Sequence, residues 1–162
     1  MIPEQSAEIL RKYPDCPSPE PIDSLSLPLK RVFADEIIDG IKTVEYREYK
    51  EHYHKRLIDK NVVKWMAENK ALLTDDEYNS ICFIRPVRRI HFYDYNGTWS
   101  LDVSIKETGM LSFSAADIKH QHELGSTECD DEFVYYQNRG IPVIRRDKYY
   151  FFAIDQVIES SL

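Results

Sequence analysis

The chain has 162 residues, a net charge of −7 and 43% hydrophobic residues, which is an ordinary composition for a soluble globular protein. Its length suits one domain with a tail, and no apolar run approaches the roughly 18 residues that a membrane helix needs. The N-terminal residues lack the basic and apolar segments of a secretory signal. The acidic net charge argues against non-specific binding of long nucleic acids, because proteins that bind nucleic acids in this way usually have a basic surface.

The cysteines are few and irregularly spaced. Cys16, Cys82 and Cys129 form an odd number at wide intervals, which predicts free thiols rather than a disulfide framework. Free thiols are typical of a reducing compartment, so we expect the protein in the cytoplasm and away from the membrane.

Residues 1–23 contain five of the eight prolines. A stretch of this kind cannot sustain a long helix or a central strand. We therefore expect an extended proline-rich arm with one or two helical turns at Ser6–Tyr13, followed by a domain over residues 24–162.

The next segment predicts a strand, a helix and a second strand. Leu25–Leu27 reads as a strand, and Pro28–Asp39 reads as a helix with its proline in the first turn. Gly40 supplies the left-handed residue that ends such a helix, and Thr43–Tyr49 reads as a strand. The apolar positions of the helix share one stripe, so Phe33 and Ile37 are expected to be buried; the stripe comprises Leu29, Val32, Phe33 and Ile37.

The middle of the chain predicts helices and then a hairpin. Residues 61–79 read as helical, and Thr74 with Glu77 predicts a capping box. Ile81–Ile84 reads as a short strand. Asn96-Gly97 lies between two alternating runs and predicts a hairpin with a type I′ turn; the runs are Arg88–Tyr95 and Thr98–Lys106.

The last third predicts a helix over Ala115–His122 and strands over Phe133–Gln137 and Lys148–Ile158. Several strands with few helices indicate a small, mostly β, barrel-like α+β fold.

One family is similar to the strand–helix–strand segment. The motif Gly-x-Lys-Thr-x-Glu-x-Arg resembles that of the ASCH domain family, a branch of the PUA-like superfamily, and its residues here are Gly40, Lys42, Thr43, Glu45 and Arg47. The run Lys50–Leu57 resembles a segment of bacterial ASCH domain-containing proteins, with His52 and His54 in place of a proline and a tryptophan. The resemblance covers about a fifth of the chain. It implies a small PUA-like β-barrel covered by one helix, with further short helices.

The resemblance and the local charge together predict a site for RNA or a nucleotide. Lys42, Glu45 and Arg47 are expected to line one concave cleft, with Tyr46, Tyr53 or Tyr93 as its wall, since basic and aromatic side chains contact phosphates and unpaired bases. The predicted nucleic-acid contacts are Lys42, Glu45, Arg47, Lys50, Tyr46, Tyr53 and Arg88. The alternative is that Glu45 and Arg47 form structural ion pairs. Lys42 is expected to be exposed, so Lys42→Ala should remove ligand binding and leave the melting temperature nearly unchanged.

An enzyme is the second hypothesis. The resemblance includes an amidohydrolase that deacetylates N4-acetylcytidine with a lysine, a threonine and a glutamate. Lys42 matches the lysine, but Glu45 occupies the position of the threonine and would act as a base for water. Glu123 and Glu128 are candidates for the distant glutamate.

The histidines form two His-x-His pairs, His52 with His54 and His120 with His122. In extended strands such pairs share a face and can hold a metal. Nothing in the sequence brings the pairs together, and His52 and His54 are expected in a charged loop after the strand Thr43–Tyr49. We therefore expect surface histidines, no metal site and no cofactor. The third hypothesis for function is a protein-interaction module that docks through the proline-rich arm.

Overall fold

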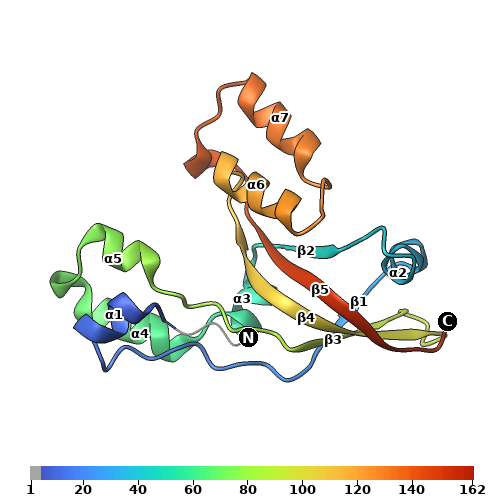
Figure 1. The fold of residues 1–162 in the computed structure, drawn as a ribbon, viewed down its shortest axis with the longest axis horizontal. Helices are drawn as coiled ribbons and strands as arrows, with labels where there is room; N and C mark the ends of the chain where they lie inside the picture. The colour runs from blue at the N-terminus through green and yellow to red at the C-terminus, as the bar shows by residue number, and fades with distance from the viewer. Residues whose placement is uncertain (1–4) are drawn as a thin grey trace.

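The computed structural model describes residues 5–162, and these residues form an α+β fold on one curled five-stranded sheet (Figure 1). The strands are β1 (Leu25–Pro28), β2 (Val44–Glu48), β3 (Arg89–Tyr93), β4 (Ser100–Leu111) and β5 (Tyr149–Ser160). The α-helices are α1 (Ala7–Lys12), α2 (Arg31–Ile38), α3 (Glu51–Leu57), α4 (Lys60–Asn69), α5 (Asp75–Ser80), α6 (Ala115–Glu123) and α7 (Asp130–Asn138). Two 3₁₀ helices complete this list, η1 (Lys70–Leu72) and η2 (Val143–Arg145).

The sheet is a half-barrel. Its strand order β1-β3-β4-β5-β2 places β1 and β2 at opposite edges, so both predicted strands of the motif segment belong to one sheet, as expected. β4 and β5 pair along most of their length, and register shifts near Asp102, Ser104 and Ile105 interrupt the ladder. Such irregularities bend and twist a strand pair, which accounts for the curl. The barrel-like α+β architecture is therefore confirmed, whereas the PUA-like fold stays a prediction.

α2 and α3 cover the concave side of the sheet. Ala34 and Ile37 of α2 and Leu57 of α3 belong to the same buried cluster as Phe92 and Phe152 from the strands. Figure 1 shows α2 at one end of the sheet, on the connection between its two edge strands. The helix predicted between the first two strands therefore packs on the barrel core.

The start of α2 differs from the prediction, because β1 extends further than expected. Pro28 is the last residue of β1 and pairs with Tyr93, and the N–H of Leu29 still donates to Tyr93 O at 3.1 Å. Proline is tolerated there because β1 is an edge strand. α2 consequently begins at Arg31, and Gly40, at φ 76°, follows it in the predicted left-handed conformation.

The predicted apolar stripe of α2 is only partly correct. Ile37 is buried, but Phe33 is 37% exposed and Val32 is exposed. The helix turns Ala34 and Ile37 toward the core, and Phe33 lies about 100° from Ala34 around the helix axis. The burial predicted for Phe33 is therefore wrong, and its ring lines an open cleft instead.

The N-terminal arm packs on its own chain. Within residues 5–23 the structure contains α1, as predicted at Ser6–Tyr13, and one isolated bridge from Ile22 to Val87. Ile9 and Cys16 are buried in a cluster with Trp65 of α4. Part of the predicted arm, residues 1–4, lies outside the described residues. No helix in residues 5–162 is long and apolar enough to cross a membrane.

Other local predictions have mixed outcomes. The capping box of Thr74 and Glu77 is present in α5, and a helix covers Ala115–Glu123. The hairpin of β3 and β4 is confirmed, but of its turn residues only Gly97 has positive φ, so the turn is not type I′. The three thiols are free cysteines, as expected.

Three segments were assigned the wrong structure from the sequence. Phe133–Gln137 lies in helix α7, whose first turn holds three acidic residues and whose apolar Phe133 and Tyr136 follow helical spacing. Ile81–Ile84 contributes one bridge, from Ile84 to Ile58, rather than a strand. The charged run after β2 forms helix α3 instead of a loop.

Candidate functional site

The motif strand β2 sends its side chains alternately to two surroundings. Val44 and Tyr46 pack with the cluster formed by α6, α7 and the ends of β4 and β5. Glu45 and Arg47 point to the opposite side, toward Pro28 and Tyr53. The strand period therefore places Glu45 and Arg47 together, as the sequence predicts.

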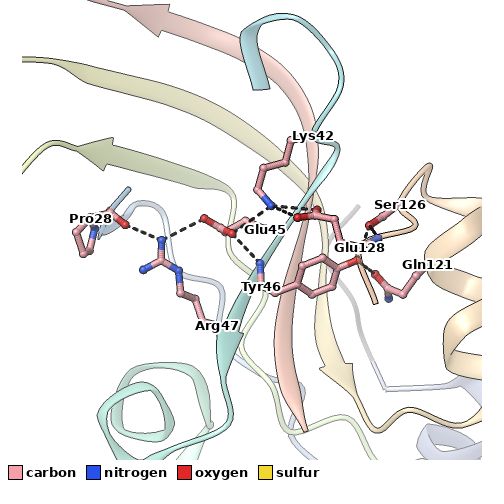
Figure 2. Close-up of polar contacts among 8 residues, drawn as sticks. All are labelled: Pro28, Lys42, Glu45, Tyr46, Arg47, Gln121, Ser126 and Glu128. Carbon is pink, nitrogen blue, oxygen red and sulfur yellow. Dashed lines mark hydrogen bonds and ion pairs between the residues drawn. The ribbon is translucent and has the colours of Figure 1, made fainter. Parts of the chain in front are cut away.

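Lys42 and Glu45 form a buried ion-paired network with Glu128 (Figure 2). The Lys42 ammonium donates to both carboxylate oxygens of Glu128, at 2.8 and 3.0 Å, and lies 3.5 Å from Glu45 Oε1. The rings of Phe33 and Tyr46 lie within 6 Å of the same ammonium, at 5.5 and 5.7 Å. The Lys42 ammonium thus lies among two carboxylates and two aromatic rings.

Arg47 connects this network to the edge strand. Its Nη2 donates to Pro28 O at 2.6 Å and to Glu45 Oε2 at 3.1 Å, and its Nη1 donates to the Tyr53 hydroxyl at 3.4 Å. Burial disfavours the charged guanidinium, but the Glu45 carboxylate and the Tyr53 hydroxyl outweigh this effect and raise the pKa of Arg47. The planar fork is therefore held between β1, β2 and α3.

Tyr46 anchors the other side of β2. Its hydroxyl donates to Gln121 Oε1 at 2.7 Å and lies 2.8 Å from Ser126 Oγ, while its N–H donates to Glu45 Oε1 at 2.9 Å. Burial raises the pKa of the Tyr46 phenol, so this group stays protonated. The Tyr46 hydroxyl therefore makes structural hydrogen bonds to α6 and to the segment before α7.

The position of Lys42 contradicts its predicted exposure. Lys42 is 6% exposed, and the clefts described below are lined by other residues. The turn after Gly40 directs this side chain inward, where Glu128 and Glu45 neutralise it. Lys42 is therefore a member of the ion-paired clamp that the sequence analysis offered as the alternative.

Two neighbouring clefts open beside this network, and they share Pro28 and Tyr95. We call their joint surface the basic–aromatic groove. The first cleft, of about 270 Å³, is lined by Pro28, Leu29, Lys30, Phe33, Glu45, Tyr46, Arg47 and Tyr95. The second, of about 500 Å³, is lined by Ser26, Leu27, Pro28, Lys50, His52, Tyr53, Arg56, Tyr93 and Tyr95.

The second cleft has an unusual charge for this acidic chain. Lys50 and Arg56 are cationic, and none of the residues lining this cleft is acidic. Its other walls include the rings of Tyr93 and Tyr95, and Tyr95 is 82% exposed. Cations beside exposed rings form the surface that phosphates and unpaired bases contact.

The predicted contact residues are divided among these places. Glu45, Tyr46 and Arg47 line the first cleft, and Lys50, Tyr53 and Tyr93 line the second. Arg88 precedes β3, at the opposite end of that strand from Tyr93, and pairs with Asp23 at 2.7 Å. Arg88 therefore lies outside the groove.

Three further residues line the groove although they are not among the predicted contacts: His52, Arg56 and Tyr95. Tyr53 and Leu57 are the buried positions of α3, and their spacing of four residues is a helical signal. The same spacing places His52 and Arg56 on one neighbouring face. Reading this run as a loop concealed that face.

The two His-x-His pairs occupy helices, not strands. His52 and His54 lie on α3, and His120 and His122 lie on α6. Residues two apart on a helix point about 200° apart, so neither pair shares a face. Across the part of the chain that the structure describes, no group of three or more His, Cys, Asp or Glu side chains could hold a metal ion.

Comparisons of the chain with protein-family models, with curated proteins and with solved structures give no match. The ASCH resemblance therefore stays a prediction, and the groove is the structural feature that bears on function.

Proposed function

We propose that the protein binds RNA or a nucleotide in the basic–aromatic groove. The observation that supports this most is the composition of the second cleft, where two cations and several aromatic rings meet and no lining residue is acidic, in a chain of net charge −7. Lys50 also pairs with Glu48, which lies outside the lining, at 3.3 Å. A local basic surface on an acidic body attracts a short anionic ligand and disfavours extended contact with a long one. The free thiols support a reducing compartment such as the cytoplasm.

In this proposal the two walls of the groove have different roles. Lys50 and Arg56, on the α3 side, contact phosphate oxygens, and the guanidinium offers a planar fork to them. Tyr93 and Tyr95, on the β3 side, stack on bases. Both walls contribute to one cleft, so phosphate and base of the same nucleotide can be held together.

The buried ion-paired network positions residues that line the groove. Glu45 orients Arg47, which in turn hydrogen-bonds the Pro28 carbonyl at the boundary of the two clefts. In the proposed function Lys42 and Glu128 keep Glu45 in place, and Arg47 fixes the distance between β1 and β2. Binding therefore depends on Lys42 indirectly, through the shape of the groove.

The test is a binding measurement with fluorescently labelled single-stranded RNA of six nucleotides, followed by competition with mononucleotides. The double variant K50E/R56E is expected to weaken binding at least tenfold, because each substitution replaces a phosphate contact by repulsion. The double variant K64E/K119E, on α4 and α6 and outside the groove, makes the same charge change and should retain the affinity. Equal loss in the variant and in this control would show a general charge effect and reject the groove.

A second candidate, an amidohydrolase acting on a modified nucleoside, is favoured by one observation. Glu128, from a distant segment, meets Lys42 at 2.8 Å, and Glu45 lies 3.5 Å from the same ammonium. A carboxylate here could take a proton from water, which would attack the acetyl carbonyl of N4-acetylcytidine and release acetate and cytidine. Incubation with N4-acetylcytidine tests this: cytidine should form with wild type and not with E128Q, and no cytidine from wild type rejects it.

A third candidate, a protein-interaction module that docks through the arm, stays a prediction. The described part of the arm has its apolar Ile9 and Cys16 buried against α4 and α5. A partner that used these side chains would have to displace the arm first. The basic–aromatic groove, in contrast, is open without such a rearrangement.

A further inference from the structure

The outward face of β3 extends the groove as a row of three aromatic rings. The rings of His91 and Tyr93 lie 6.3 Å apart with an angle of 23° between their planes, and those of Tyr93 and Tyr95 lie 6.5 Å apart, edge to face at 78°. His91 and Tyr93 share a face because they are two residues apart in a strand. We call His91, Tyr93 and Tyr95 the ring ladder; its first member lies beyond the residues that line the clefts.

The ladder is accessible and oriented. The His91 side chain is 40% exposed, and its Nδ1 lies 2.5 Å from Asp102 Oδ1, so a hydrogen bond to β4 fixes the ring plane. The buried side of β3 holds Ile90 and Phe92, which are fully covered by the core. His91 and Tyr93 therefore project from a paired strand, and Tyr95 follows them in the hairpin turn.

The basic side chain of Arg56 lies beside the ring ladder, near His91. Ser26 of β1 pairs with His91 in register, and Arg56 of α3 donates to Ser26 O at 3.2 Å. Arg56 thus lies near the strand position that neighbours His91, while it also lines the cleft that contains Tyr93 and Tyr95. Arg56 therefore supplies a positive charge beside the row of rings.

We infer that the ligand is a single-stranded nucleic acid segment of at least three nucleotides, with successive bases on Tyr95, Tyr93 and His91 and the phosphates toward Lys50 and Arg56. This inference rests on the proposed function and specifies its ligand. Aromatic side chains on a sheet face take two or three unstacked bases in this way. A base-paired duplex does not present its base faces, so the ladder selects single strands.

The experiment compares ligands of increasing length on the full chain. Wild type is measured with mononucleotides, with single strands of two, three and six nucleotides as RNA and as DNA, and with a duplex of six base pairs. Affinity should rise at least fivefold from two to three nucleotides and little from three to six, and the duplex should bind more weakly than either single strand. The RNA and DNA arms decide which sugar the site prefers.

The variant H91A tests the contribution of the His91 ring to affinity separately from that of the groove residues. It should lower the affinity for three or more nucleotides about five- to tenfold, as loss of one stacking ring does, and leave the dinucleotide affinity unchanged. H91Y keeps a ring and should restore the affinity, while H122A, an exposed histidine on α6, should have no effect. Melting curves of H91A establish that it is folded.

The outcomes distinguish the two proposals. Equal affinity for two, three and six nucleotides, with H91A like wild type, overturns the ladder and leaves a groove for a nucleotide or dinucleotide. Preferential binding of the duplex also overturns the ladder. No binding of any nucleic acid, with wild type folded, rejects the proposed function together with the ladder.

Discussion

The buried network around Lys42 and the basic–aromatic groove lie side by side, yet they use charge in opposite ways. In the network, each cation faces a carboxylate: Lys42 meets Glu128 and Glu45, and Arg47 meets Glu45. In the second cleft of the groove, Lys50 and Arg56 share the lining with neutral residues and rings alone. Lys50 does pair with Glu48, but both side chains are more than half exposed, so solvent screens that pair. Neutralised charge inside the fold acts on stability, whereas solvent-accessible charge at a cleft acts on binding.

The two regions also come from one continuous stretch of sequence. Lys42, Glu45 and Arg47 precede Lys50 and Arg56 by only a few residues. The change occurs where β2 ends and α3 begins: the Arg47 side chain of β2 is 14% exposed, and the Lys50 side chain just before α3 is 54% exposed. A charged motif in the sequence is therefore not by itself a binding motif.

The largest effect should come from breaking the network at Lys42. K42M is expected to lower the free energy of unfolding by about 2 kcal/mol, below the usual cost of breaking a buried pair because Glu128 is 42% exposed and Glu45 keeps Arg47. Urea unfolding measures this change. The matched control K50M should stay within about 0.5 kcal/mol of wild type, because Lys50 is exposed. Equal stability of K42M and wild type would remove the distinction between the two regions.

Arg47 belongs to both regions, so its substitution tests their connection. In R47K a single ammonium replaces the fork and cannot reach Pro28 O, Glu45 and Tyr53 together. Stability should fall by about 1–2 kcal/mol, and RNA affinity should fall as well because the boundary between the clefts loosens. Thermal melting and the binding assay are run on the same preparation. A loss of affinity at unchanged stability would instead indicate that Arg47 contacts the ligand directly.

Salt dependence distinguishes direct phosphate contact from such indirect support. For single strands the slope of log K against log salt falls by about 0.7 for each phosphate contact that is lost. R56Q should reduce the slope by about this amount and weaken binding severalfold, with stability close to that of wild type. K42M should weaken binding without changing the slope. The same slope in R56Q and in wild type would place Arg56 outside the phosphate path.

The smallest effect is expected at an ion pair outside both regions. His120 Nε2 lies 2.5 Å from Glu107 Oε2, and this hydrogen bond raises the pKa of His120 above its ordinary value. The stabilisation is therefore fully present below about pH 6.5 and is lost as the pH rises through the raised pKa. E107Q should be less stable than wild type by under about 1 kcal/mol at pH 6, because the pair is half exposed, and should match it at pH 9. A difference that grew toward pH 9 would have the wrong sign.

Sequence patterns that depend on nearby residues predicted local structure well. Leu25–Leu27 and Thr43–Tyr49 were recognised as strands, Gly40 as the left-handed residue after α2, and Thr74 with Glu77 as a capping box. The two-residue period of β2 also predicted that Glu45 and Arg47 share a side. In each case the physical cause lies within one element.

The tertiary structure decided the remaining features, because they depend on which elements meet. No spacing in the sequence indicates that Glu128 reaches Lys42, or that α7 rather than a strand packs beside Tyr149. Lys42 can be buried because the distant segment brings Glu128 beside it, and a buried ammonium requires such a carboxylate. The sequence by itself determined the two strands of the motif segment, the cap and the charged motif. Only the packing of α2, α3 and the 126–128 segment around β2 decided which charges are enclosed and which face the groove.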